Sequence, residues 1–119
     1  MRISELSAKT NVSVHRLRRY EEAGLISSTR LTNGYRDYPS QTIRHVVFIS
    51  MSREMGFSLA AIADHLPRFK SGNLSAEEMV QAIRERISDI EKVIAEQTAL
   101  KEMLIKHIAW FQIQQRKKK

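Results

Sequence analysis

Three arginines fall within four positions of one short segment, at Arg16, Arg18 and Arg19, with His15 before them and Tyr20 after them. A guanidinium group presents a rigid fork of N–H donors that matches the O6/N7 edge of guanine or a phosphate. A tyrosine can stack on a base or donate a hydrogen bond to a phosphate. On a helix, Arg16 and Arg19 share one face because they lie three residues apart. The segment is therefore a candidate for recognition of a polyanion.

The same segment has a simpler interpretation when it is taken alone. Glu21 and Glu22 follow Tyr20, and they can serve as local partners of the arginines on an ordinary solvated helix face. The local pattern does not choose between this interpretation and DNA recognition. The elements around the segment must decide.

Those elements predict two short helices joined by a turn. Ser4 is expected to cap a first helix that ends near Thr10, and Ser13 has the residue type and place of an N-cap for a second. Gly24 is placed to end this second helix, because glycine adopts the left-handed conformation found just beyond many helix ends. Two helices with a short turn between them predict a helix-turn-helix, which favours the DNA interpretation.

A β-hairpin is predicted next. Asn33-Gly34 is a strong signal for a type I′ turn, which requires positive φ at both central residues. The second strand carries Tyr35, Arg36 and Tyr38, and so short a ribbon must pack on the rest of the domain. We expect at least one of these tyrosines to pack inward and Arg36 to reach outward to the sugar-phosphate backbone.

Two further helices are predicted before residue 70. The first opens at Pro39 and Ser40 and runs to about Met55; the second is capped by Ser58 and stopped by Pro67. The first of these helices should bury a helical stripe of Ile43, Val46, Val47 and Met51.

A long helix over residues 75–113 follows, opened by a capping box at Ser75 and Glu78 and containing neither glycine nor proline. Its apolar residues recur at heptad spacing, with Gln97 and Lys101 interrupting the seam. The seam contains Val80, Ile83, Ile87, Ile90, Ile94, Leu104, Ile108 and Phe111. One side of so long a helix would be bare unless a second copy covered it, so the pattern predicts a homodimeric coiled coil.

Charge divides the chain in the same way as these elements. The 119 residues carry a net charge of +7 with a pI of about 10.1. Residues 1–70 hold eleven Lys or Arg against six Asp or Glu, residues 71–115 hold five against seven, and residues 116–119 are all basic. We therefore predict a mainly α-helical protein with a small hairpin wing: a DNA-binding head at 1–70, a hinge at 71–74, a dimerisation helix at 75–113 and a basic tail at 114–119.

Several other classes of protein are disfavoured. The sequence contains no cysteine, which removes disulfides and thiolate metal sites, and its histidines lack i, i+4 ligand spacing, so no metal and no cofactor is expected. It shows no secretory signal, no stretch long enough to span a bilayer and no nucleophile-base constellation. We expect a cytoplasmic protein that is neither an enzyme nor a membrane protein.

Several motifs together resemble the MerR family of bacterial transcription regulators. They are Ile3-Ser4-Glu5-Leu6, Val12-Ser13-Val14-His15-Arg16-Leu17-Arg18, Tyr20-Glu21-Glu22-Ala23-Gly24-Leu25-Ile26, Asn33-Gly34-Tyr35-Arg36-Asp37-Tyr38 and Arg53-Glu54-Met55-Gly56-Phe57-Ser58-Leu59. The likeness covers roughly residues 1–70 in unbroken order. It implies a winged helix-turn-helix head whose second helix enters the major groove of double-stranded DNA, and an antiparallel coiled coil between two subunits.

The resemblance also implies a mechanism and a set of contact residues. Family members sit on an overlong promoter spacer and distort the DNA, so that RNA polymerase, an indirect partner, can use both promoter elements. Dimerisation falls to Ile83, Ile87, Ile90, Ile94, Leu104 and Ile108. The implied DNA-contacting residues are Ser13, His15, Arg16, Arg18, Arg19, Tyr20, Tyr35, Arg36, Tyr38 and Arg53.

The chain departs from the family pattern in two ways. Arg19 stands where many members carry an aromatic residue, which predicts an additional base or phosphate contact. No cysteine-bearing metal loop or separate effector domain follows the long helix within this sequence. Met103, Trp110 and Phe111 are left with two interpretations: a pocket for an apolar effector between subunits, or packing against the partner's head. The identity of any small-molecule effector, and activation against repression, stay open.

Two rival functions remain. An architectural DNA-bending protein, such as a recombination accessory factor, would share the winged head, although it would not need the long heptad helix. An adaptor whose coiled coil binds another protein would carry the basic head only incidentally. A monomeric stem would favour the adaptor.

Overall fold

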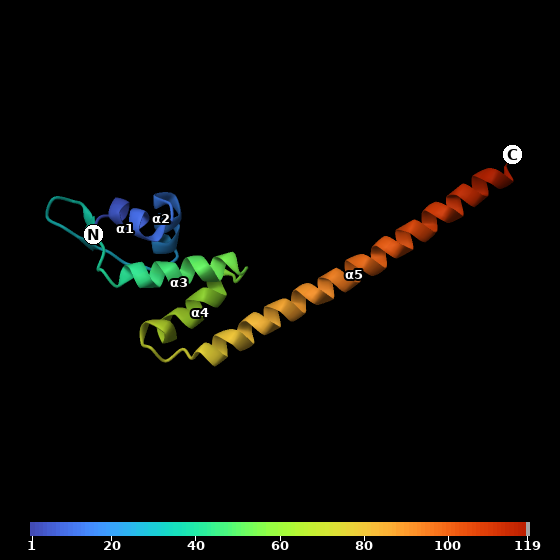
Figure 1. Cartoon of the computed structure of the whole chain (residues 1–119). Helices are drawn as coiled ribbons and strands as arrows, with labels where there is room; N and C mark the ends of the chain where they lie inside the picture. Colours follow the sequence, from blue (N-terminus) through green and yellow to red (C-terminus); the bar gives the residue numbers. More distant parts are fainter. Residues whose placement is uncertain (119) are drawn as a thin grey trace. The chain divides into compact units, whose positions relative to one another are not determined.

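The computed structural model describes residues 1–118, which divide into two compact units, Met1–Ser75 and a second unit that begins at Ala76. The first unit holds four helices and a two-stranded hairpin, and the second is a single helix (Figure 1). This confirms the predicted fold class, which is mainly helical with a small antiparallel wing.

The helix-turn-helix consists of α1 (Ile3–Thr10) and α2 (Val14–Glu22). Ser13 caps α2 as predicted, because its Oγ accepts a hydrogen bond of 3.1 Å from the backbone N–H of Arg16. Gly24 follows α2 with φ +76°, as the sequence also predicted. The cap predicted for α1 is wrong: Arg2 is the N-cap residue and Ser4 lies inside the helix.

The hairpin pairs β1 (Thr29–Arg30) with β2 (Arg36–Asp37) in antiparallel register. The predicted type I′ turn is wrong, because Gly34 has positive φ and Asn33 does not. Leu31 and Tyr35 instead close a three-residue loop: the Gly34 N–H donates to the Leu31 carbonyl at 3.0 Å, and the Leu31 N–H donates to the Tyr35 carbonyl at 2.8 Å. This is the pattern of a type I turn followed by a left-handed glycine.

The core of the first unit lies where α1 packs against both α2 and α3 (Thr42–Glu54), with α4 (Leu59–Lys70) packed on α3. Phe48 of α3 and Phe69 of α4 stack with ring centroids 4.2 Å apart. The buried apolar residues are Leu6, Val12, Leu17, Tyr20, Leu25, Ile26, Tyr38, Val46, Phe48, Ile49, Ile62 and Leu66. This one core fixes the positions of α2 and the wing.

Two predictions for this region are wrong. Val46 is buried as expected, but Val47 and Met51 are about half exposed, because α3 turns the side containing Phe48 and Ile49 inward. Pro67 does not stop α4, which continues to Lys70 and ends before Gly72 at φ +78°. The added turn places Phe69 on Phe48, and packing of that kind offsets the hydrogen bond that the proline cannot donate.

The second unit is α5 (Ala76–Lys117), one helix of 42 residues without interruption (Figure 1). It begins directly after Ser75, as predicted, with Glu77 and Glu78 in its first turn. It runs further than predicted, so the expected basic tail is helical to Lys117, and Lys119 lies outside the described residues. No side chain of α5 is buried within the single chain.

His45 on α3 makes the stability of the first unit depend on pH. Burial, and then the positive charges of Lys70 and Arg44, lower the pKa of His45 below its ordinary value of about 6.5. The unfolded chain therefore binds this proton more tightly than the folded chain does. The contribution of neutral His45 to stability is complete above about pH 6.5 and is lost as the pH falls toward the lowered value.

We expect His45→Gln to flatten this part of the pH dependence. The melting temperature of the natural protein should fall more steeply between about pH 7 and pH 5 than that of the variant. Thermal unfolding followed by circular dichroism at several pH values measures both slopes. Parallel curves for the two proteins would contradict the assignment.

Candidate nucleic-acid interface

Helix α2 separates an inward face from an outward one. Leu17 and Tyr20, three residues apart, point into the core, and their exposed fractions are 0% and 4%. The basic residues occupy the rest of the helix surface. The exposed side chains are His15, Arg16, Arg18 and Arg19. Because the core fixes the apolar face, the cationic face is presented rigidly to solvent.

Tyr20 contacts Arg16 from the core side of α2. Its hydroxyl accepts a hydrogen bond of 2.9 Å from Nη2 of Arg16, and the guanidinium carbon lies 5.9 Å from the ring centroid. Protein atoms cover the ring, so it is not available to stack on a base. The stacking or phosphate contact expected of Tyr20 is therefore revised to a positioning role: the residue restricts where the outer donors of Arg16 point.

Glu21 joins α2 to the wing. One carboxylate oxygen, Oε1, accepts a hydrogen bond from the Tyr38 hydroxyl. The other, Oε2, accepts a hydrogen bond of 3.0 Å from Ser28 and lies 3.4 Å from Nη1 of Arg36. The simpler interpretation of the basic segment made Glu21 a local partner of the arginines on its own helix. The structure turns it toward residues seven to seventeen positions away.

Tyr38 is a core residue, with 1% of its surface exposed. Burial, followed by the hydrogen bond and the negative charge of Glu21, raises the pKa of its hydroxyl. Tyr38 is thus the inward-packing tyrosine that the sequence called for, and its expected contact with DNA is revised to anchoring the wing. Arg36 remains accessible, with 43% of its side chain exposed.

The other side of β2 faces the start of the chain. The guanidinium carbon of Arg2 lies 4.1 Å from the ring centroid of Tyr35, which is exposed. The Met1 ammonium lies 2.8 Å from Oδ1 of Asp37, and the Tyr38 N–H donates to the Met1 carbonyl at 2.7 Å. These contacts hold the wing from its second side.

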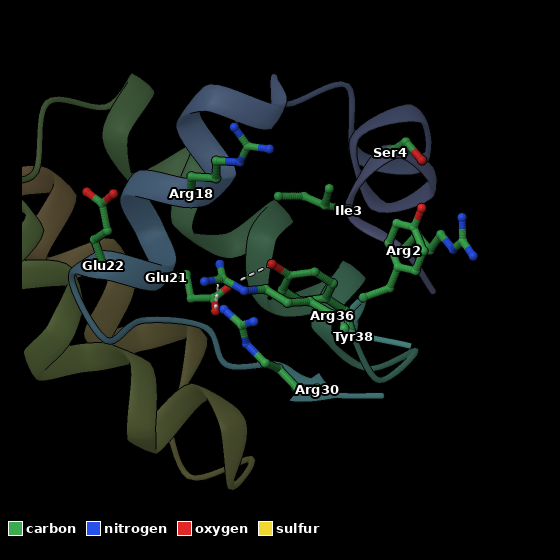
Figure 2. Close-up of a pocket in the computed structure, with 11 residues that line it drawn as sticks. Arg2, Ile3, Ser4, Arg18, Glu21, Glu22, Arg30, Arg36 and Tyr38 are labelled. Atoms are coloured by element: carbon green, nitrogen blue, oxygen red, sulfur yellow. Dashed lines mark hydrogen bonds and ion pairs between the residues drawn. The ribbon is translucent and has the colours of Figure 1, made fainter. Parts of the chain in front are cut away.

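Between α1, α2 and the wing lies an open hollow of about 780 Å³ (Figure 2). Four arginines and two glutamates contribute to its wall, so its charge favours an anion. The lining residues are Arg2, Ile3, Ser4, Arg18, Glu21, Glu22, Arg30, Gly34, Tyr35, Arg36 and Tyr38.

The hollow unites only part of the set expected from the sequence. Of the expected DNA-contacting residues, those at the hollow are Arg18, Tyr35, Arg36 and Tyr38, and those elsewhere are Ser13, His15, Arg16, Arg19, Tyr20 and Arg53. Arg53 is exposed, and its Nη1 donates to the Phe57 carbonyl at 3.0 Å, in the turn between α3 and α4. The expected set of DNA-contacting residues did not include Arg2 or Arg30. Their positive charge was a signal, but only the fold brings them to Arg18.

The residues predicted for dimerisation lie along α5, and all but the half-buried Ile83 are exposed in the single chain. The three residues considered for an effector pocket lie on the same helix. Trp110 and Phe111 meet edge to face with ring centroids 4.9 Å apart, and Met103 is exposed. Within residues 1–118 no three His, Asp or Glu are grouped to hold a metal ion. Among those residues no helix has the length and apolar character needed to cross a membrane.

Comparison with known proteins identifies the family. The profile of the MerR HTH family regulatory proteins matches residues 1–68, and a second profile, described as MerR, DNA binding, matches residues 43–107. The chain belongs to the MerR family. It is accordingly a DNA-binding transcription regulator and not an enzyme.

Individual relatives agree with this assignment. Heavy metal-dependent transcription regulator 2 of Rhizobium meliloti is 31% identical over 112 residues, covering 92% of this chain and 74% of the relative. The lead(II) complex of PbrR691 from Ralstonia metallidurans CH34 superposes with a TM-score of 0.71 at 27% identity, covering 88% and 82% of the two chains. HiNmlR, a MerR family regulator lacking the sensor domain and bound to promoter DNA, shares the fold with a TM-score of 0.60 at 20% identity, covering 94% and 86%.

Within this MerR regulator, the revised role of Tyr38 predicts a stability effect. Tyr38→Phe keeps the packed ring and removes the hydroxyl that donates to Glu21. We expect the free energy of unfolding to fall by about 1.5–3 kcal/mol, the range for a hydrogen bond to a charged group. Denaturant unfolding measures the change. Tyr35→Phe, on the exposed face of the wing, is the matched control and should cost much less; equal losses would contradict the anchoring role.

Proposed function

We propose that this MerR regulator binds an inverted-repeat operator in a promoter spacer as a homodimer and controls transcription by distorting the DNA. In this proposal α2 enters the major groove and the wing follows the neighbouring sugar-phosphate backbone. The observation that carries it is the arrangement of the first unit, in which the outward arginines of α2 adjoin the arginine-lined hollow beside the wing.

The division of labour follows from how each arginine is held. Arg16 and Arg19 lie on the outer face of α2 and suit contact with base edges. Arg18 and Arg36 line the hollow, together with Arg2 and Arg30, and suit contact with phosphates. Tyr20 and Tyr38 position other side chains: the Tyr20 hydroxyl accepts a hydrogen bond from Arg16, and the Tyr38 hydroxyl donates one to Glu21. His15 and Ser13 lie at the first turn of α2, and Arg53 is proposed to reach a phosphate near the α3–α4 turn.

The second unit supports the homodimer. A helix of 42 residues is about 63 Å long at 1.5 Å per residue, and its heptad seam is exposed in the single chain. An antiparallel pair of such helices would bury both seams and carry one head at each end. Two linked heads suit two half-sites in successive major grooves. We propose boundaries close to those expected from the sequence, a cytoplasmic location and RNA polymerase as an indirect partner.

The experiment begins with selection of bound genomic fragments by the purified protein. Footprinting of the best fragment, with and without RNA polymerase, then shows where and how the protein binds. The proposal predicts an inverted repeat inside an overlong promoter spacer, with enhanced cleavage at its centre where the DNA is distorted. Tight binding without preferred sequence, falling steeply with salt, would contradict it and favour the architectural alternative.

A further inference from the structure

Glu21 is the one carboxylate that contacts the cationic wall of the hollow directly among the described ion pairs, and the DNA interface above gives it no task. Its Oε2 lies 3.4 Å from Nη1 of Arg36, and four-fifths of the Glu21 side chain is buried. Figure 2 shows the side chains of Arg30 and Arg36 extending from the wing toward Glu21 on α2. A phosphate entering the hollow would have to approach the same guanidinium groups. In the protein without DNA, one of these groups, Arg36, is already paired with the Glu21 carboxylate.

Glu21 cannot easily leave this place. The Tyr38 hydroxyl donates to Oε1 and the Ser28 hydroxyl donates to Oε2, so both oxygens are held by neighbouring groups of the protein itself. Arg36 is much freer: 43% of its side chain is exposed, and no second carboxylate within residues 1–118 pairs with it. When a phosphate arrives, Arg36 is therefore the partner that moves, and the negative charge of Glu21 stays beside the incoming anion.

We infer that Glu21 is an internal anionic competitor that lowers the affinity of the wing for any DNA. The inference rests on the proposed DNA-binding function. Each binding event exchanges an Arg36–carboxylate contact for an Arg36–phosphate contact, and the remaining carboxylate repels the backbone. Wing contacts carry no sequence information, so weakening them lowers random binding directly and leaves discrimination to the base contacts of α2.

The substitution Glu21→Gln separates competition from anchoring. A glutamine keeps one oxygen that can accept the Tyr38 hydrogen bond, while it removes the negative charge that holds Arg36. We expect the variant to bind a random duplex about two- to fivefold more tightly than the natural protein, the effect of an ion pair whose arginine is open to solvent. The plot of log affinity against log salt should become steeper by less than about 0.9, the value for one complete phosphate contact, because Arg36 then neutralises its phosphate without a carboxylate beside it.

Glu22→Gln is the matched control. Glu22 also lines the hollow and carries the same charge, but it forms no ion pair with Arg36. Its removal should raise the affinity less than Glu21→Gln does. If Glu21 only anchors the wing, Glu21→Gln would bind no more tightly than the natural protein, and that result overturns the inference. An equal gain from both substitutions would overturn it as well, since a general charge effect would then suffice.

A second comparison does not require Glu21→Gln to fold. Arg30 lines the same hollow without an ion pair to a carboxylate in the described chain, whereas Arg36 must first give up Glu21. Arg30→Ala should therefore reduce random-duplex affinity more than Arg36→Ala does, and the reverse order contradicts the inference. Fluorescence anisotropy at several salt concentrations provides each value. Failure of the natural protein to bind any duplex would instead refute the proposed function.

Discussion

Ile94→Asp should convert the protein to a monomer and reduce its affinity for an inverted-repeat operator by about a hundredfold or more. Ile94 lies near the middle of the seam on α5, and 59% of its surface is exposed in the single chain. In the proposed dimer this position faces the partner helix. An aspartate there would bury an unpaired charge at the centre of the interface, which costs far more than the apolar contact it replaces.

The large effect on DNA binding follows from the connection of two DNA-binding heads in one dimer. Two joined heads bind two half-sites with a high effective concentration, and a single head loses that gain without losing any contact of its own. Light scattering measures the mass, and anisotropy on full and half operators measures both affinities. Ala95→Asp is the matched control, because it places the same charge one residue along, about 100° around the helix and off the seam. A dimeric Ile94→Asp variant would contradict the coiled coil.

Arg16→Ala should lower affinity for the selected operator by about five- to a hundredfold, the cost of one good contact with a base edge. Affinity for a random duplex should change much less, so the ratio of specific to random binding falls. The reason is the geometry of α2. Tyr20 holds one nitrogen of the Arg16 fork at 2.9 Å, which leaves the outer donors directed away from the core.

Arg18→Ala tests the difference between the base contact assigned to Arg16 and the phosphate contact assigned to Arg18. Arg18 lines the hollow, and we assign it to the backbone, so its loss should weaken specific and random binding by similar factors. The salt dependence of log affinity should also become shallower by about 0.9. Competition anisotropy with both duplexes distinguishes the two arginines. Equal weakening of both duplexes by Arg16→Ala would show that the role given to Arg16 is wrong.

The features that local chemistry determines were predictable from the sequence. Ser13 and Gly24 mark the two ends of α2 because a capping hydroxyl and a left-handed glycine act within a few residues. The long helix α5 was predictable for a similar reason, since its apolar periodicity repeats over many turns. The MerR resemblance then assigned a function to elements that the residues had already located.

The failures have tertiary causes. Pro67 should end a helix by local rules, yet α4 continues, because the next turn carries Phe69 to its stack on Phe48. Val47 and Met51 fit an apolar stripe, but α3 meets its neighbours through a different side. Spacing gave a partial signal for Tyr20, three residues after the buried Leu17, that it lies on the apolar face of α2.

The site was hardest to predict where it depends on contacts between distant residues. Arg2 and Arg30 reach the hollow only because the start of the chain and the wing come together beside α2. The link from Glu21 to Tyr38 spans 17 positions, and nothing in the charge pattern distinguished Glu21 from Glu22. Sequence patterns locate elements, and the packing of those elements decides which side chains meet.

One titration tests the central claim most directly: the stoichiometry and affinity of the purified protein on a selected full operator, on its half-site and on a random duplex, at one fixed salt concentration. We predict two chains per full operator, with affinity at least about a thousandfold above that for the random duplex and far weaker binding to the half-site. One chain per operator, or equal affinity for operator and random duplex, would contradict a homodimeric, sequence-specific regulator.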